Sequence, residues 1–410
     1  MSAAVQAATP LRRNADFMRL WVAGTISAAG SQVTAFAMPI TAILVLHAGA
    51  FQVGLLMAAT YLPLTLFGLF AGAWADRVRR RPLLVAADLV RAAAIGSVPM
   101  AFVLHVLSID LLYAVALVAG TLTVLFDVAH GSYLPELVDK DALVAANSRL
   151  QVSEQGASVL GPAAGALLVT AVGAPLALAV DAVSFLGSAA VLLTIAHREA
   201  DPPQAARLTI LADIAEGLRY VASRPSLRAF ATSTFLANLF LRMISTVLVL
   251  HLVRVVGLAP SIVGVVLSIG ELGFLAGAFS AGAVRKRLSL PSTLAIAVVL
   301  IALSGFPIAL APASVAVELT ALGLFVYGFA AVIWTISSGA YRQGTTPSNL
   351  LGRTGSVMRV AAWGPIPIAS IAAGALAGAS STRTAMIVAA VGALAAAIPV
   401  NVWRLRGAPD

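Results

Sequence analysis

The sequence predicts an all-α membrane protein with twelve transmembrane helices arranged in two six-helix bundles. Three observations support this prediction: 60% of the 410 residues are hydrophobic, only 10% are charged, and long apolar runs alternate with short polar links. One membrane-spanning helix needs roughly 20 residues, so the chain has room for about a dozen. A soluble fold would not need so much apolar surface.

The first six spans form a predicted N-terminal bundle over residues 1–196. Its apolar runs cover about 20–46, 53–74, 83–104, 111–133 and 151–172, and a sixth run follows the Gly173–Pro175 turn and extends to about 196. The link between the second and third spans is short and strongly basic, whereas the link between the first and second carries no Lys or Arg.

A long polar stretch, residues 197–228, divides the predicted bundles. Within it Leu211, Ile214, Leu218 and Val221 recur at helical spacing, with charged residues between them. This pattern predicts an amphipathic helix that lies on the inner membrane surface. A solvated linker helix would fit the same pattern.

The C-terminal bundle, residues 229–410, repeats the plan of the first. Its predicted spans cover about 229–250, 261–284, 292–310, 315–336, 356–378 and 382–402. At a constant separation of 208 positions, Gly131, Tyr133, Leu143 and Ser148 recur as Gly339, Tyr341, Leu351 and Ser356. Chance could explain these four matches, but they fall at the same span-to-loop junction in both halves. This position favours an internal repeat of a kind known in transporters.

Basic residues are concentrated in the links on one side of the predicted membrane. Only Arg254 and Arg383 fall in links on the other side. By the positive-inside rule both termini are cytoplasmic, in a multi-pass protein of the cell membrane. The net charge of +9 is explained by this bias, so we expect no nucleic-acid partner. Disulfide and thiol chemistry are excluded, since the sequence has no cysteine.

The basic link contains the pattern Gly72-x-x-x-Asp76-Arg77-x-x-Arg80-Arg81. This pattern resembles the loop between helices two and three of the major facilitator superfamily. The resemblance extends over nearly the whole chain through the span count, the central linker and the two-half repeat. It implies the major facilitator fold, in which a central cavity opens alternately to either side.

Further stretches narrow the resemblance to one branch. The motif Gly156-x-x-x-x-Gly161-Pro162-x-x-Gly165 resembles that of drug-exporting proton antiporters. The runs at residues 87–91 and 347–353 resemble the branch that holds enterobactin and macrolide exporters. The fourth span lacks the arginine found in many proton antiporters, so the resemblance does not identify the proton-coupling site.

Charged residues near the inner ends of the spans are candidates for a gate. Asp76 and Arg80 match hairpin positions that act as an inner gate in the superfamily, and Asp127 lies near the inner end of the fourth span. Asp88 and Arg91 are three residues apart and can pair on one helix face. A topogenic role for Asp76, Arg80 and Asp127, and a structural ion pair for Asp88 and Arg91, are the alternatives. The predicted gate cluster comprises Asp76, Arg77, Arg80, Asp88, Arg91 and Asp127.

The deepest charges in the second bundle are candidates for coupling. Arg242 and Glu271 each lie roughly 20 Å along their helix from its inner end, at about 1.5 Å per residue. Ionisable residues in a span are functional candidates by default, so we expect Glu271 to bind a proton or a cationic substrate, with Arg242 as its partner. A static buried pair is the alternative. Asp181, Asn238 and Trp334 are further candidates, although helix-to-helix hydrogen bonds explain such residues as well.

The predicted function is secondary active transport: the efflux of a small lipophilic drug or secondary metabolite, exchanged for protons. The alternatives are a siderophore or metabolite exporter and a non-transporting sensor of the same fold. We expect no cofactor or metal and no enzymatic activity, because the sequence shows no metal-ligand spacing, nucleotide-binding loop or catalytic triad. The expected partners are a small-molecule substrate, protons and the lipid bilayer, and the expected state is a monomer.

Overall fold

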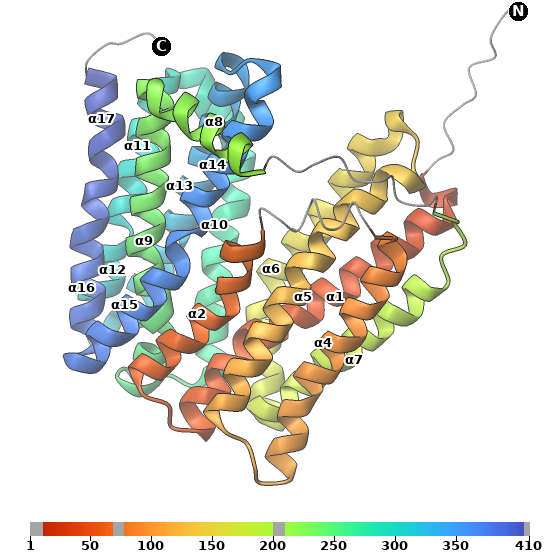
Figure 1. Cartoon of the computed structure of the whole chain (residues 1–410). Helices are drawn as coiled ribbons and strands as arrows, with labels where there is room; N and C mark the ends of the chain where they lie inside the picture. Colours follow the sequence, from red (N-terminus) through yellow and green to blue (C-terminus); the bar gives the residue numbers. More distant parts are fainter. Residues whose placement is uncertain (1–10, 69–77, 200–209, 406–410) are drawn as a thin grey trace, which may run out of the picture. The chain divides into compact units, whose positions relative to one another are not determined.

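The computed structural model describes residues 11–68, 78–199 and 210–405, and these contain helices and no β-strand (Figure 1). Within them, twelve helical segments are long and apolar enough to cross a membrane. Each coincides with one of the predicted spans. The prediction of an all-α protein with twelve transmembrane helices is therefore confirmed.

The chain divides into two compact units. Unit one consists of Met1–Met38 and Leu66–Leu208. Near one end of this unit, Phe17, Leu84, Phe126 and Tyr133 form a buried apolar cluster that holds several helices together. The long helices of unit one are α1 (Ala15–Ile40) up to Met38, α4 (Arg80–Val103), α5 (Ile109–Leu137), α6 (Leu143–Val172) and α7 (Ala174–Leu193).

Unit two consists of Pro39–Thr65 and Thr209–Asp410, so it includes the second span. That span packs closely on α15, because a Cβ placed on Gly54 would lie 2.8 Å from the Cα of Gly374. The predicted division into residues 1–196, 197–228 and 229–410 stays a prediction. The helices of unit two are α2 (Ala50–Phe67) up to Thr65, α8 (Ile210–Ser223), α9 (Pro225–Arg254), α10 (Pro260–Arg287), α11 (Leu290–Leu303), α12 (Gly305–Leu310), α13 (Ala316–Thr345), α14 (Leu351–Trp363), α15 (Pro365–Ala379), α16 (Thr382–Ala393) and α17 (Ala397–Leu405).

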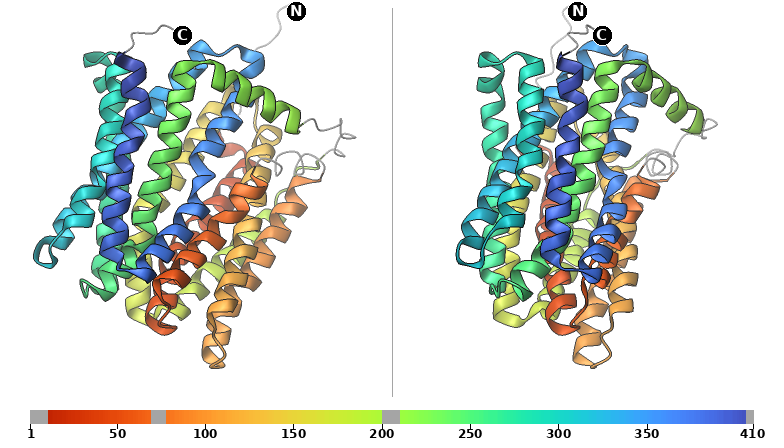
Figure 2. Two further views of the ribbon diagram at one scale, coloured as in Figure 1. Left: turned by 60° about the vertical axis from the view of Figure 1, so that its left-hand side comes forward. Right: turned by 90° about the vertical axis from the view of Figure 1, so that its left-hand side faces the viewer.

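The linker helix α8 packs against a transmembrane helix of its own unit. It runs across the end of the long helices, where it appears in green (Figure 2). Gly217 faces the backbone of Arg353 on α14, and Glu216 forms an ion pair with the side chain of Arg353. The expected amphipathic helix is therefore present, and it is docked onto α14.

Glycine allows two long neighbouring helices of unit two to pack closely. On α10, Gly273 and Gly277 face the backbone of Phe325 and Phe329 on α13, and a Cβ on Gly273 would lie 2.9 Å from the Cα of Phe325. Small residues at such a contact let helix backbones approach each other in a membrane. This packing fixes the position of α13, which carries much of the site described below.

The internal repeat predicted from the sequence is visible in the helix boundaries. Helix α5 ends at Leu137 and α13 ends at Thr345, 208 positions later. Short 3₁₀ turns follow at Lys140–Ala142 and Ser348–Leu350, again 208 positions apart. The next helices, α6 and α14, begin at the same separation. The repeat is thus confirmed at the junction that predicted it.

Candidate functional site

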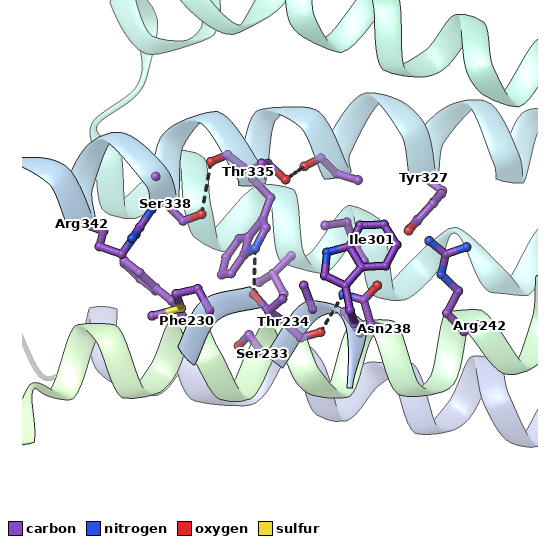
Figure 3. A pocket seen from close by; sticks show the side chains of 18 of the residues that line it. Phe230, Ser233, Thr234, Asn238, Arg242, Ile301, Tyr327, Thr335, Ser338 and Arg342 are labelled. Atoms are coloured by element: carbon purple, nitrogen blue, oxygen red, sulfur yellow. Dashed lines mark hydrogen bonds between the residues drawn. The ribbon is translucent and has the colours of Figure 1, made fainter. Parts of the chain in front are cut away.

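A cavity of about 400 Å³ lies between helices of unit two (Figure 3). Small-molecule sites in proteins usually range from about 300 to 1,000 Å³. The cavity is lined by α9, α10, α11, α13 and α14. Its lining residues are Phe230, Ser233, Thr234, Ala237, Asn238, Arg242, Phe274, Val298, Ile301, Tyr327, Ala331, Trp334, Thr335, Ser338, Gly339, Arg342, Met358, Ala362 and Trp363.

Two helix faces supply most of this lining. On α9, Phe230, Thr234, Asn238 and Arg242 follow one another at intervals of four and so lie on one face. On α13, the lining positions from Tyr327 to Arg342 recur at intervals of three and four. The helical period therefore places aromatic, hydroxyl and cationic side chains on the same wall.

Hydrogen bonds hold the middle of this wall in place. The indole Nε1 of Trp334 donates to Oγ1 of Thr234 at 3.2 Å, and Nδ2 of Asn238 donates to the carbonyl oxygen of Thr234 at 3.0 Å. The ring of Phe230 lies edge-on to Trp334, with centroids 5.8 Å apart. The candidate residues Asn238 and Trp334 thus lie in one cavity and are linked through Thr234.

Arg242 also lines this cavity, but its expected pair with Glu271 is not a direct contact. Among the described residues, no carboxylate lies within 4.0 Å of the Arg242 guanidinium, although Glu271 is within electrostatic range. The guanidinium lies 6.0 Å from the ring of Tyr61, and its Nε has no hydrogen-bond partner. Glu271 is half-buried on α10 and does not belong to the cavity lining.

Unit one contains a separate cluster of buried charges around Arg91. The Arg91 side chain is almost completely buried, and its guanidinium lies between two rings, 4.3 Å from Phe126 and 4.2 Å from Phe185. It forms an ion pair with Asp88, which is fully buried. This pair is sealed inside the helix bundle and away from solvent.

Two more carboxylates are near the same arginine. Asp127 on α5 and Asp181 on α7 are both within electrostatic range of Arg91. Asp181 is 1% exposed and accepts hydrogen bonds from Thr34 at 2.5 Å and from Ser184 at 3.1 Å. Asp127 is exposed on its helix. The structure therefore brings together three predicted acids from three helices around one cation.

At the start of α4, the predicted gate residue Arg80 forms an ion pair with Glu136, at 2.8 Å. Glu199 accepts hydrogen bonds from the backbone N–H groups of Arg80 and Arg81. The positive end of the helix dipole stabilises a carboxylate at this position. The other two predicted gate residues, Asp76 and Arg77, lie outside the described residues. Sequence reasoning missed Glu136 and Glu199, because only the fold brings them to this helix end.

The glycines of the fifth-span motif lie against α1. Gly161 faces the side chain of Gln32, and a Cβ on Gly165 would lie 3.2 Å from Cβ of Phe36. Gly156 has no neighbour within 4 Å of such a Cβ. Helix α6 continues through Pro162. The motif therefore supports close packing between the first and fifth spans.

Other residues of the site were not predicted from the sequence. Arg342 is not among the predicted site residues, yet it lines the cavity with Tyr327 and Phe230. The repeating spacing along α13 was the signal that could have identified Arg342 and Tyr327. Within the described part of the chain, no group of three or more metal-ligating side chains could hold a metal ion.

Comparison with known sequences places this site in a family of transporters. A family described as transmembrane secretion effector matches residues 5–409. The multidrug efflux pump Tap of Mycolicibacterium fortuitum is 29% identical over 376 residues, which cover 89% of this chain and 90% of the pump. Tap of Mycobacterium tuberculosis strain H37Rv is 27% identical over 378 residues, 89% of this chain and 88% of that protein.

Solved structures resemble the fold. The nucleoside transporter NupG has a TM-score of 0.76 at 11% identity and covers 94% of this chain and 98% of its own. A bacterial homologue of the iron transporter ferroportin, in an inward-facing state, has a TM-score of 0.74 at 18% identity and covers 96% of this chain and 99% of its own. At these identities the likeness concerns the fold alone.

Proposed function

Since the chain belongs to the transmembrane secretion effector family of the major facilitator superfamily, we propose that it exports small lipophilic drugs or secondary metabolites in exchange for protons. The chain is a multi-pass membrane transporter and not an enzyme. Efflux, proton coupling and alternating access are the proposed part.

The observation that carries this proposal is the cavity of unit two. It is large enough for a drug-sized molecule, and its walls combine aromatic rings with a few fixed polar groups. Two relatives that each align with 89% of the chain are described as multidrug efflux pumps.

Proton coupling is proposed for carboxylates inside the spans. Asp181 is buried in unit one without a direct ion-pair partner among the described residues. Glu271 lies near Arg242 without touching it. A proton can drive substrate movement only if it binds the inward-open and outward-open states with different affinity. A carboxylate whose neighbours move between those states meets this condition.

The test is transport into inside-out membrane vesicles with an imposed proton gradient, acid inside. We expect wild-type vesicles to accumulate at least one compound from a panel of lipophilic antibiotics and dyes. Asp181→Asn and Glu271→Gln keep the side-chain size but remove the carboxylate. The variant that alters the proton-coupling site should lose gradient-driven accumulation. Asp110→Asn, an exposed residue in the first turn of α5, is the control and should accumulate as wild type.

Each result has a definite meaning. Equal accumulation in both acid variants and in wild type would discard Asp181 and Glu271 as coupling sites but would keep the exporter. Accumulation in wild type without dependence on the gradient would contradict proton coupling. No accumulation of any compound would contradict lipophilic efflux.

A further inference from the structure

We propose that the cavity of unit two selects an anionic small molecule that carries a flat ring system. This inference rests on the proposed function, since it names the substrate class of the same cavity. It differs from the expectation drawn from sequence, in which Glu271 attracts a cation. The argument depends on the charge, the hydrogen-bonding groups and the rings of the lining.

The lining is positively charged. Arg242 and Arg342 both line the cavity, whereas no aspartate or glutamate among the described residues does. Figure 3 shows the two arginines at opposite ends, with Thr234 and Asn238 between them. In a low-dielectric site a cationic ligand would be repelled by both ends, and an anion would be attracted by either.

Neither arginine is neutralised by a direct partner. In the described part of the chain, neither guanidinium has a carboxylate within 4.0 Å. The Nη1 of Arg342 donates only to the carbonyl oxygen of Leu351, at 3.3 Å. Glu271 is near enough to Arg242 to moderate its charge but not to occupy its donors. The guanidinium groups therefore remain available for an incoming carboxylate, phosphate or phenolate.

The remaining wall suits a ring. Phe230, Phe274, Tyr327, Trp334 and Trp363 line the cavity with aromatic faces and edges. Such side chains bury large apolar area and pack against rings in offset or edge-on geometry. The Trp334 indole N–H is already bonded to Thr234, so this ring contributes apolar surface to a ligand. Rings in the middle and cations at the ends match an aromatic anion.

The test compares two dyes with the same xanthene ring system and opposite charge, fluorescein (anionic) and rhodamine 123 (cationic). Equilibrium dialysis of the purified, detergent-solubilised protein at mildly alkaline pH measures their binding, with detergent alone as the background. We expect fluorescein to bind more tightly than rhodamine 123. We also expect Arg242→Gln and Arg342→Gln each to weaken fluorescein binding by about tenfold or more, the range for a hydrogen bond to a charged group.

Arg404→Gln is the matched control, because it removes one exposed positive charge outside the cavity and should bind fluorescein as wild type. If size-exclusion chromatography shows that Arg242→Gln is not folded, the inference is tested with Arg342→Gln and with Arg242→Lys, which keeps the charge. Arg242→Lys should keep much of the preference for fluorescein over rhodamine 123.

Three results would overturn the inference. They are tighter binding of rhodamine 123 than of fluorescein, no binding of fluorescein to the wild type, and fluorescein binding that is unchanged in both Arg242→Gln and Arg342→Gln. Dye transport into vesicles separates this failure from failure of the proposed function. Arginine-dependent binding without transport would leave the anion site standing and remove the exporter. Transport of cationic dyes alone would keep the exporter and remove the anion site.

Discussion

Arg91 illustrates how a full charge can be held inside a transmembrane bundle. Its guanidinium is planar, so it can pair with Asp88 while it also lies over the rings of Phe126 and Phe185. A lysine at this position could keep the ion pair but could not fill the space between two rings. The residue therefore serves as both an ion-pair partner and a packing element.

We expect Arg91→Gln to lower stability by about 3–5 kcal/mol, because it leaves the Asp88 carboxylate buried without its partner. The double variant Asp88→Asn/Arg91→Gln should be more stable than Arg91→Gln alone, since no charge of the pair is then left uncompensated. Thermal unfolding of the purified protein in detergent measures both. Equal unfolding temperatures for the single and double variants would show that the pair is not coupled in this way.

Some residue-level features follow from sequence and others need the fold. The three-residue spacing of Asp88 and Arg91 was enough to expect a local pair, because helix geometry brings such positions together. The two rings around Arg91 come from α5 and α7, so no local pattern indicates them. The direct contact expected between Arg242 and Glu271 was inferred from equal depth alone, and depth does not determine the direction of a side chain.

At the scale of elements, the contact between α10 and α13 depends on glycine. A methyl group on Gly273 would collide with the backbone of Phe325, which cannot move without displacing α13. We expect Gly273→Ala to lower stability by about 1–3 kcal/mol, the usual range for overpacking. Thermal unfolding in detergent, followed by size-exclusion chromatography, is the measurement.

Gly282 on the same helix provides a matched control. No atom lies within 4 Å of a Cβ placed there, so Gly282→Ala should leave the unfolding temperature unchanged or raise it slightly, because alanine favours a helix over glycine. The explanation by close packing fails if the two substitutions destabilise the protein equally.

The docking of α8 on α14 depends on shape more than on charge. A Cβ on Gly217 would lie 2.6 Å from the carbonyl oxygen of Arg353, so Gly217→Val should release the helix and speed tryptic cleavage at Arg219 several-fold. Glu216→Gln should have little effect, because the side chains of its ion pair are 45% and 34% exposed and such pairs contribute about 0–1 kcal/mol.

Ala222→Val controls for the β-branched side chain, since Ala222 is exposed on the same helix. Its cleavage rate should match that of the wild type. Equal rates for Gly217→Val and Ala222→Val would mean that the Gly217 contact does not hold α8 in place.

Element boundaries were predicted less well than element existence. Apolar runs identified every span, because a run of about 20 apolar residues is long enough to cross the membrane as a helix, which satisfies its own backbone groups. Helix α6, however, begins at Leu143, several residues before its apolar run, since helical structure continues through a polar segment. The eleventh span is interrupted at Gly364, just before Pro365, where proline cannot donate to the helix.

At the scale of the whole molecule, the orientation can be tested directly because the sequence contains no cysteine. Ser348 and Ser380 are exposed residues at the two ends of the eleventh span, and cysteine is nearly isosteric with serine. With cytoplasmic termini, Ser380→Cys should react with a membrane-impermeant maleimide in intact cells, and Ser348→Cys only after permeabilisation. The opposite pattern would place both termini outside.

The twelve-span fold and its repeat could be derived from sequence because hydropathy and a constant spacing act over the whole chain. The position of the cavity could not, since it depends on how five helices of unit two pack. The grouping of the second span with the C-terminal helices follows from the contact between Gly54 and Gly374, two small residues far apart in the chain. Sequence periodicity carries no information on such distant contacts.

The aromatic lining of the cavity also gives the protein an optical property. The chain has five tryptophans, and two of them, Trp334 and Trp363, lie in the cavity wall. Trp21 is hydrogen-bonded to Ser153 in unit one, and Trp403 packs edge-on against Phe230. Two of the five tryptophans therefore report on the cavity, and a compound that stacks there changes the emission of the unlabelled protein.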